Sequence, residues 1–140
     1  MSGIIALANL KGGVGKSTLA VNVAGALSPK SVLIDADPQA TASAWGEAGE
    51  LPFDIVSAPL NGDNVQGWIE TVLSQDADFT VIDLPPMLGD ATAAALAICD
   101  LAAIPVSPSG ADLRATNRAV ELVANARAAR DDGKPYALLI

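Results

Sequence analysis

The stretch Lys11-Gly12-Gly13-Val14-Gly15-Lys16-Ser17-Thr18 decides the fold. It directly follows an apolar run that predicts a strand over Gly3–Ala8, and it opens a segment that predicts a helix over Lys16–Leu27. Glycines allow positive φ and bring backbone N–H groups close to an anion, and a helix N-terminus adds further donors. The order strand, glycine-rich turn, helix is therefore typical of a loop that binds phosphate.

The end of this stretch fits the P-loop pattern G-x-x-x-x-G-K-[ST] through Gly15, Lys16 and Ser17, whereas Leu10 stands where the first glycine should be. We expect Lys16 to reach the β- and γ-phosphates of a nucleotide and the Ser17 hydroxyl to ligate Mg²⁺. The alternative is a glycine-rich turn with an unrelated lysine, which the flanking strand and helix disfavour.

Carboxylates follow two further apolar runs. Asp35 and Asp37 come at the end of Val32–Asp35, and Asp83 ends Phe79–Asp83, before a double proline. The carboxyl ends of strands in an open α/β sheet face the ligand crevice, and alternation along a strand can point Asp35 and Asp37 the same way. Asp83 fits the strand-end carboxylate that holds Mg²⁺. The alternatives are a turn-forming Asp37 that caps the next helix and an Asp83 that accepts from loop amides.

Short aliphatic runs alternate with helix-like segments along the whole chain. This alternation predicts an α/β fold, a doubly wound and mostly parallel sheet with helices on both faces. The predicted strands are Gly3–Ala8, Val32–Asp35, Phe53–Ser57, Phe79–Asp83, Leu101–Val106 and Tyr136–Ile140. The predicted helices are Lys16–Leu27, Ala40–Trp45, Gly62–Ser74, Asp90–Ile98 and Asp112–Arg130, with Asp90 and Asp112 as N-caps.

Composition excludes several classes of protein. The 140 residues are 51% hydrophobic and 17% charged, which predicts one folded domain. The chain has no histidine, which excludes a Ser-His-Asp triad, a Cys-His dyad and histidine-bound zinc. Cys99 is the one cysteine, so no internal disulfide forms, and its apolar surroundings predict a buried thiol. With no apolar stretch of membrane-spanning length and no signal peptide, we expect a cytoplasmic protein.

The charge is uneven along the chain. The net charge is -8, and the segment from Ser31 to Leu113 has thirteen acidic residues and no lysine or arginine. A uniformly basic nucleic-acid binder is excluded, so any DNA contact needs a local patch. Arg114 and Arg118 share one helix face, with Arg127 and Arg130 roughly 120–180° around the helix from them. A DNA-binding face and a solvated helix of mixed charge both fit this pattern.

The early lysine makes the first motif more specific. The variant K-G-G-x-G-K-[ST], with Lys11, resembles the deviant Walker A box of the ParA/MinD family of ATPases. Asp35-Ala36-Asp37-Pro38-Gln39 and Asp83-Leu84-Pro85-Pro86 resemble two further motifs of that family. Asp112-Leu113-Arg114-Ala115-Thr116 resembles the helix start of the smaller plasmid-partition members.

The resemblance implies a P-loop NTPase fold and a site for ATP or ADP with Mg²⁺. It implies that Lys11 acts in trans on the γ-phosphate region of a partner subunit, that Asp37 positions the attacking water, and that Asp35 supports the magnesium shell of Ser17 and Asp83. Lys11, Lys16 and Asp37 are the expected catalytic residues. The expected nucleotide-binding residues are Lys11, Gly12, Gly13, Val14, Gly15, Lys16, Ser17 and Thr18.

In function, the resemblance implies a weak ATPase for plasmid or chromosome partitioning. Its ATP-bound homodimer would bind nonspecific DNA and a centromere-binding, ParB-type partner, and no membrane is expected. The alternatives are a MinD-like membrane-cycling cell-division ATPase, a nucleotide-binding scaffold without turnover, and a metal-cluster carrier. The single Cys99 disfavours the last, because the related iron proteins bridge their cluster with two cysteines per subunit.

The chain stops at Leu138-Leu139-Ile140, inside a run typical of a buried strand. Natural termini are usually polar and lie outside the core. We therefore expect residues 1–140 to form a single P-loop ATPase domain that lacks its C-terminal portion. By the resemblance, the residues that contact adenine would lie beyond Ile140.

Overall fold

The computed structural model describes residues 3–8, 16–47, 49–60, 64–86, 89–106 and 110–140. Six strands in the described part form one sheet in the order β3-β2-β4-β1-β5-β6, and every neighbouring pair is parallel. The strands are β1 (Gly3–Leu7), β2 (Ser31–Asp35), β3 (Asp54–Ser57), β4 (Phe79–Asp83), β5 (Leu101–Ile104) and β6 (Tyr136–Leu139). The helices are α1 (Lys16–Ala26), α2 (Thr41–Gly46), α3 (Val65–Leu73), α4 (Asp90–Ile98) and α5 (Gly110–Ala128).

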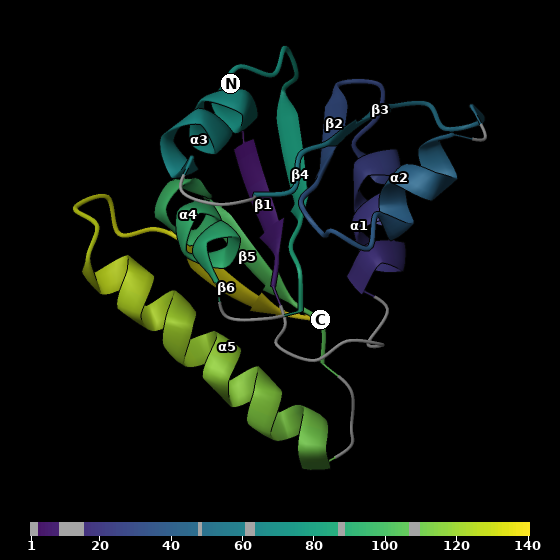
Figure 1. Ribbon diagram of the computed structural model, residues 1–140. Helices are drawn as coiled ribbons and strands as arrows, with labels where there is room; N and C mark the ends of the chain where they lie inside the picture. The colour runs from purple at the N-terminus through teal and green to yellow at the C-terminus, as the bar shows by residue number, and fades with distance from the viewer. Residues whose placement is uncertain (1–2, 9–15, 48, 61–63, 87–88, 107–109) are drawn as a thin grey trace.

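Helices cover both faces of the sheet, with α1 and α2 on one face and α3, α4 and α5 on the other (Figure 1). Successive strand residues point to opposite faces, so each central strand serves two cores. Leu33 of β2 and Val81 of β4 pack with α1 and α2, whereas Ile34 and Ile82, one position later, pack with α3, α4 and α5. Because both faces are covered, the central strands are continuously aliphatic, and the prediction of a doubly wound sheet is confirmed.

Two predicted N-caps are wrong, although the predicted bounds of α4, Asp90–Ile98, are confirmed. Helix α4 begins at Asp90 with Gly89 as its N-cap, and α5 begins at Gly110, which places Asp112 inside its first turn. Neither aspartate is therefore an N-cap, although an acidic residue in a first turn still suits the helix dipole. Helix α3 begins at Val65 after Asn64, whose side chain accepts a hydrogen bond of 3.1 Å from the Gly67 N–H. Its predicted start at Gly62 lies outside the described residues.

Strand register determines which loops meet. Asp83, the last residue of β4, pairs with Asp35 of β2 on one side and with Leu7 of β1 on the other. The chain therefore leaves three neighbouring strands at the same edge of the sheet. Ligands of open α/β sheets bind at this edge, so the fold places the predicted motifs side by side.

Candidate functional site

The centre of the candidate site is Asp83. Its side chain is 0% exposed and its two oxygens have different partners. The Lys16 Nζ donates to Asp83 Oδ1 at 2.7 Å, and the Ser17 hydroxyl donates to Asp83 Oδ2 at 2.6 Å. Two motifs that lie more than sixty residues apart in the sequence thus converge on one carboxylate.

The fold explains this convergence. Strand β1 leads to Lys16, the first residue of α1, and β4 ends at Asp83 beside the end of β1. Lys16 is 6% exposed, which is unusual for a lysine unless it is paired. A buried ammonium and a buried carboxylate stabilise each other only at close range, and their desolvation offsets much of the gain. A pair of this kind indicates a site that is arranged for a ligand more than for stability.

Several predicted residues of the phosphate loop lie outside the described part of the structure. These are Lys11, Gly12, Gly13, Val14 and Gly15, so their predicted roles stay predictions. Thr18 is described and is exposed in the first turn of α1, where its carbonyl accepts from the Asn22 side chain at 2.8 Å. The roles predicted for Lys16 and Ser17 also stay predictions, although the structure places both residues at the predicted edge of the sheet.

The residues at Asp83 fit a magnesium ion. Mg²⁺ prefers hard oxygen ligands, and nucleotide enzymes commonly hold it through one or two side chains together with phosphate oxygens. The Ser17 hydroxyl and the Asp83 carboxylate supply adjacent oxygens of this kind. Among the described residues, no group of three or more acidic or cysteine side chains could hold a metal ion. The donor set at Asp83 therefore suits an ion that arrives with a nucleotide.

The second acidic motif forms the loop between β2 and α2. Because β2 ends at Asp35, strand alternation does not set the direction of the Asp37 side chain, and a common direction for the two carboxylates stays a prediction. The Asp37 Oδ1 accepts from the Gln39 N–H at 2.9 Å, a turn that aspartate side chains commonly make. Asp35 is 0% exposed, and its Oδ2 accepts from both the N–H and the hydroxyl of Ser43, at 2.8 and 2.7 Å. The magnesium role predicted for Asp35 is a prediction that this geometry does not test.

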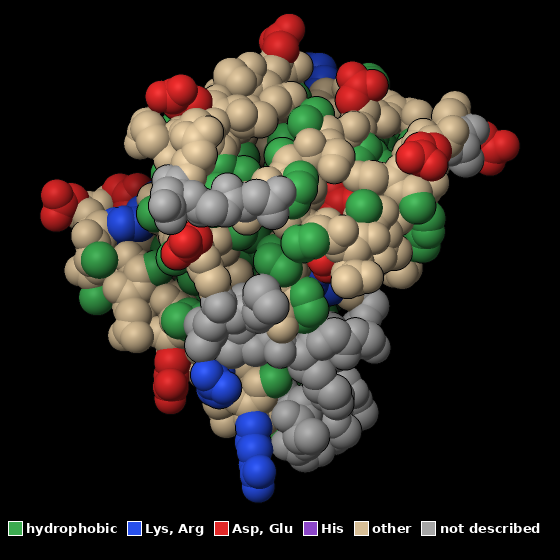
Figure 2. Space-filling view, viewed as in Figure 1, with side chains coloured by type: hydrophobic (Ala, Val, Ile, Leu, Met, Phe, Trp, Pro, Cys, Tyr) green, Lys and Arg blue, Asp and Glu red, His purple; other side chains and the backbone are tan. Residues whose placement is uncertain are grey.

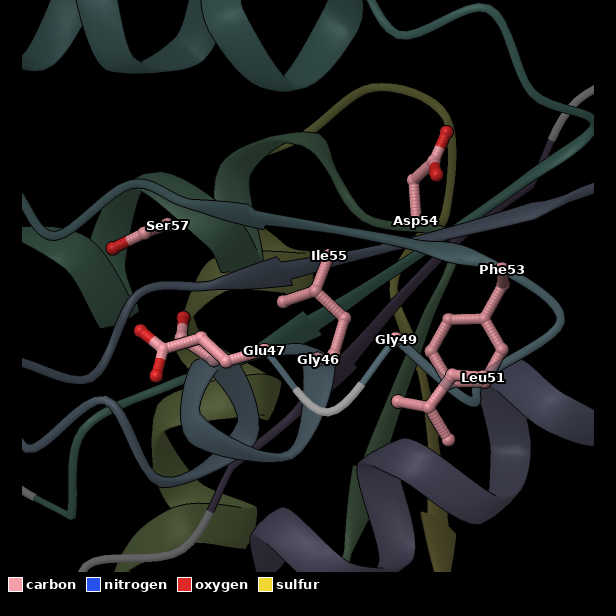
Figure 3. A pocket seen from close by; sticks show the side chains of 9 residues that line it. Gly46, Glu47, Gly49, Leu51, Phe53, Asp54, Ile55 and Ser57 are labelled. Carbon is pink, nitrogen blue, oxygen red and sulfur yellow. The ribbon is translucent and has the colours of Figure 1, made fainter.

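Ser43 is the residue of this region that the sequence did not identify. It lies in the first turn of α2, eight residues after Asp35, and no motif links the two. It also lines a cavity of about 470 Å³ between α2 and β3, whose other walls include Glu47, Phe53 and Ile55 (Figure 3). Only the conformation of the intervening loop brings Ser43 to Asp35, so local sequence held no signal for the contact.

The basic residues of α5 have different roles. Arg114 and Arg118 are exposed, and Lys and Arg side chains project at the end of the molecule where α5 begins (Figure 2). Arg127 lies over the ring of Tyr136, with 5.2 Å from its guanidinium carbon to the ring centroid. Arg130 just beyond the helix donates to the carbonyls of Leu96 and Cys99, at 3.0 and 2.7 Å. Arg130 is therefore structural, and the first half of α5 holds the cations that can meet a ligand.

Cys99 is buried, as predicted. Burial raises the pKa of the Cys99 thiol to about 12, because a thiolate would lose its hydration there. The thiol therefore stays protonated at neutral pH, and Cys99 is a core residue.

The described residues contain no helix that is both long enough and apolar enough to span a bilayer.

A family model described as the CobQ/CobB/MinD/ParA nucleotide binding domain matches residues 5–132. The maintenance of carboxysome distribution protein A of Halothiobacillus neapolitanus is 38% identical over 127 residues, which are 88% of this chain and 59% of that protein. The chain thus spans less than two thirds of the length of this relative.

Solved structures share the fold. A putative plasmid partition protein from Borrelia burgdorferi bound to AMPPNP superposes with a TM-score of 0.78 at 22% identity, over 99% of this chain and 74% of that one. Cobyrinic acid a,c-diamide synthase from Mycobacterium smegmatis with bound ADP and magnesium gives a TM-score of 0.74 at 19% identity, over 99% and 72%. At these identities the similarity establishes the architecture alone.

Proposed function

The chain belongs to the CobQ/CobB/MinD/ParA nucleotide-binding domain family, and from that premise we propose that it is a magnesium-dependent ATPase that positions a cargo. The observation that carries the proposal is the convergence of Lys16 and Ser17 on the buried Asp83. This arrangement combines a cation for phosphate with oxygen ligands for a metal, at the edge of the sheet where ligands bind.

Lys16 binds the β- and γ-phosphates in this proposal. Its ammonium faces a carboxylate in the structure, and a triphosphate offers it a competing anion. The Ser17 hydroxyl and the Asp83 carboxylate then hold Mg²⁺, which neutralises charge on the phosphate oxygens. Thr18 and the loop from Lys11 to Gly15 complete the nucleotide contacts.

Asp37 orients the attacking water. Its loop begins directly after β2, whose end lies beside Asp83, and its side chain is 9% exposed. Phosphoryl transfer needs positioning and charge stabilisation more than covalent chemistry, so one oriented carboxylate near the γ-phosphate suffices. Lys11 of a second copy of the chain acts on the γ-phosphate region of the nucleotide, so that hydrolysis and dimer contact depend on each other.

The proposed cargo is a plasmid or chromosome that is bound through a centromere-binding partner protein. The ATP-bound dimer binds DNA without sequence preference, and the exposed Arg114 and Arg118 are its best-placed contacts among the described residues. A second candidate cargo is a protein compartment, which the 38% identity to a carboxysome distribution protein favours. Both cargoes use the same nucleotide switch and differ in the partner that is recruited.

Phosphate release measured with ATP, Mg²⁺ and the protein tests the reaction, with Asp37→Ala as the variant that keeps ATP binding and loses turnover. Asp131→Ala, a change of an exposed aspartate beyond α5, is the matched control and should hydrolyse ATP like the wild type. Equal turnover by the wild type and Asp37→Ala would contradict the proposed role.

Lys11→Ala tests the dimer. We expect this variant to bind labelled ATP as a monomer and to lose ATP-dependent dimerisation in analytical ultracentrifugation. Co-sedimentation with DNA and with anionic liposomes, each with ATP or ADP, separates a partition ATPase from a membrane-cycling one. ATP-dependent pelleting with liposomes alone would favour the second.

A further inference from the structure

The loop that carries Asp37 is held in place by contacts outside the phosphate site. Ala40, the residue before α2, has φ 55 and ψ 35, a left-handed conformation that is unfavourable for a residue other than glycine. Such a conformation persists only where surrounding contacts determine it. The Ala40 N–H donates to the Asp37 carbonyl at 2.9 Å, so the geometry of Ala40 and that of Asp37 are linked.

Asp35 supplies the contacts that span this loop. Its Oδ1 accepts from the Asp37 N–H at 3.3 Å, and its Oδ2 accepts both donors of Ser43. One buried carboxylate at the end of β2 therefore contacts both Asp37, the first residue of the turn that Ala40 closes, and the helix that follows this turn. A charged acceptor makes hydrogen bonds about twice as strong as a neutral one does.

Helix α2 has room to move if this anchor is lost. At its far end, Gly46 packs beneath the side chain of Ile55, and the cavity of about 470 Å³ opens beside it (Figure 3). A helix of six residues has little stability of its own, so its position depends on tertiary contacts. Two kinds of contact tie its first turn to the sheet: Ala42 packs in the core with Leu33, and Ser43 donates two hydrogen bonds to Asp35, which lies next to Asp83.

We propose that Asp35 is a positioning residue which, through Ser43, holds the Asp37 loop in the geometry that ATP hydrolysis requires. The proposal rests on the proposed ATPase function and assigns Asp35 a role away from the metal. Loss of the contact should leave ATP and Mg²⁺ binding intact, because Lys16, Ser17 and Asp83 are untouched. It should slow the hydrolytic step, because Asp37 would then sample other positions.

The test compares three serine variants in steady-state ATP hydrolysis. Ser43→Ala removes one donor to Asp35 and should lower kcat about tenfold, with the Kd for ATP and the Mg²⁺ concentration for half-maximal rate unchanged. Ser43→Thr keeps the hydroxyl and should restore kcat to within about twofold. Ser57→Ala alters another serine that lines the same cavity, on β3, and should match the wild type.

Hydrogen exchange of the α2 amides gives a readout that does not depend on turnover. Ser43→Ala should exchange faster over residues 41–46 than the wild type, and Ser43→Thr should not. A wild-type kcat for Ser43→Ala, in a protein that does hydrolyse ATP, would overturn the positioning role alone. A raised Mg²⁺ requirement in Ser43→Ala would also overturn it, in favour of a metal role for Asp35. Absence of ATP hydrolysis in the wild type would remove the proposed function and this inference together.

Discussion

Two lysine–aspartate pairs of nearly equal length lie at opposite ends of the sheet. Lys16 and Asp83 meet at 2.7 Å with side chains 6% and 0% exposed, where β4 ends. Lys134 and Asp100 meet at 2.6 Å with side chains 39% and 36% exposed, where β5 begins. The distances are almost the same, so distance alone does not distinguish the two pairs.

Burial is the difference that matters. An exposed ion pair replaces contacts with water that were nearly as good, so it contributes little to stability. A buried pair has lost its hydration, so removal of one partner leaves the other buried without a compensating charge. Substitution of either residue of the Asp83 pair should therefore destabilise the fold, and a competing anion can attract Lys16 away from Asp83. The pair at Asp100 mainly joins two segments of chain.

Lys16→Ala should have the largest effect. It leaves the Asp83 carboxylate buried without its cation, which we expect to lower the free energy of unfolding by about 3–5 kcal/mol. It should also abolish ATP binding. Urea denaturation and titration with labelled ATP measure the two effects separately.

The double variant Lys16→Met with Asp83→Leu is the control for this prediction. It removes both charges and should recover most of the lost stability while ATP binding stays absent. If Lys16→Ala were as stable as the wild type, the buried Asp83 carboxylate would not need its cation, and the argument from burial would be wrong.

Arg130→Ala should have an intermediate effect at the opposite end of the sheet. Arg130 donates to the carbonyls of Leu96 and Cys99, which end α4, and also pairs with Asp132 at 2.6 Å. Loss of a charged donor to buried carbonyls costs about 1–3 kcal/mol. Thermal unfolding should show the loss, with ATP binding unchanged.

Arg127→Ala is the matched control for this variant. Arg127 lies in the last turn of α5 and contacts only the face of Tyr136 among the contacts seen in the described residues, so its loss should cost less than about 1 kcal/mol. Equal losses for the two arginines would show that the carbonyl contacts of Arg130 are not stabilising.

The sequence predicted all six strands from their aliphatic runs. In β2, β4 and β5 these runs reflect burial on both faces, whereas β6 at the edge of the sheet is exposed along its length, so the prediction of a buried strand there is wrong. The sequence also predicted the bounds of α4 correctly but not the N-caps of α4 and α5, since Asp90 and Asp112 have cap-forming side chains but lie inside the first turns of these helices. Local preference favours an aspartate as a cap, and tertiary packing decides where the helix begins.

The sequence also predicted one part of the candidate site and missed another. Asp83 ends β4, and Lys16 and Ser17 open the helix that follows the neighbouring strand β1, so parallel pairing of the two strands brings them together. The link from Asp35 to Ser43 depends on a left-handed residue at Ala40, which no local preference of alanine would predict. The contact between Asp35 and Ser43 arises only in the folded chain, so the sequence pattern could not predict it.

Lys134→Ala should have the smallest effect, and its dependence on pH tests the comparison most directly. Burial alone would raise the pKa of Asp100, but hydrogen bonds from Lys134 and from the Ile4 N–H outweigh it and hold that pKa below its ordinary value of 3.8. The hydrogen bond to Asp100 raises the pKa of Lys134 above its ordinary value of 10.5.

The stability that the exposed pair contributes is therefore present between about pH 4 and pH 10. It is lost as the pH falls through the lowered pKa of Asp100, or rises through the raised pKa of Lys134. The difference in unfolding free energy between wild type and Lys134→Ala should be small and flat across that range, and should vanish at both ends and in 1 M salt. A difference as large as that of Lys16→Ala would mean that exposure does not separate the two pairs, and the argument from burial would then fail at the Asp83 site as well.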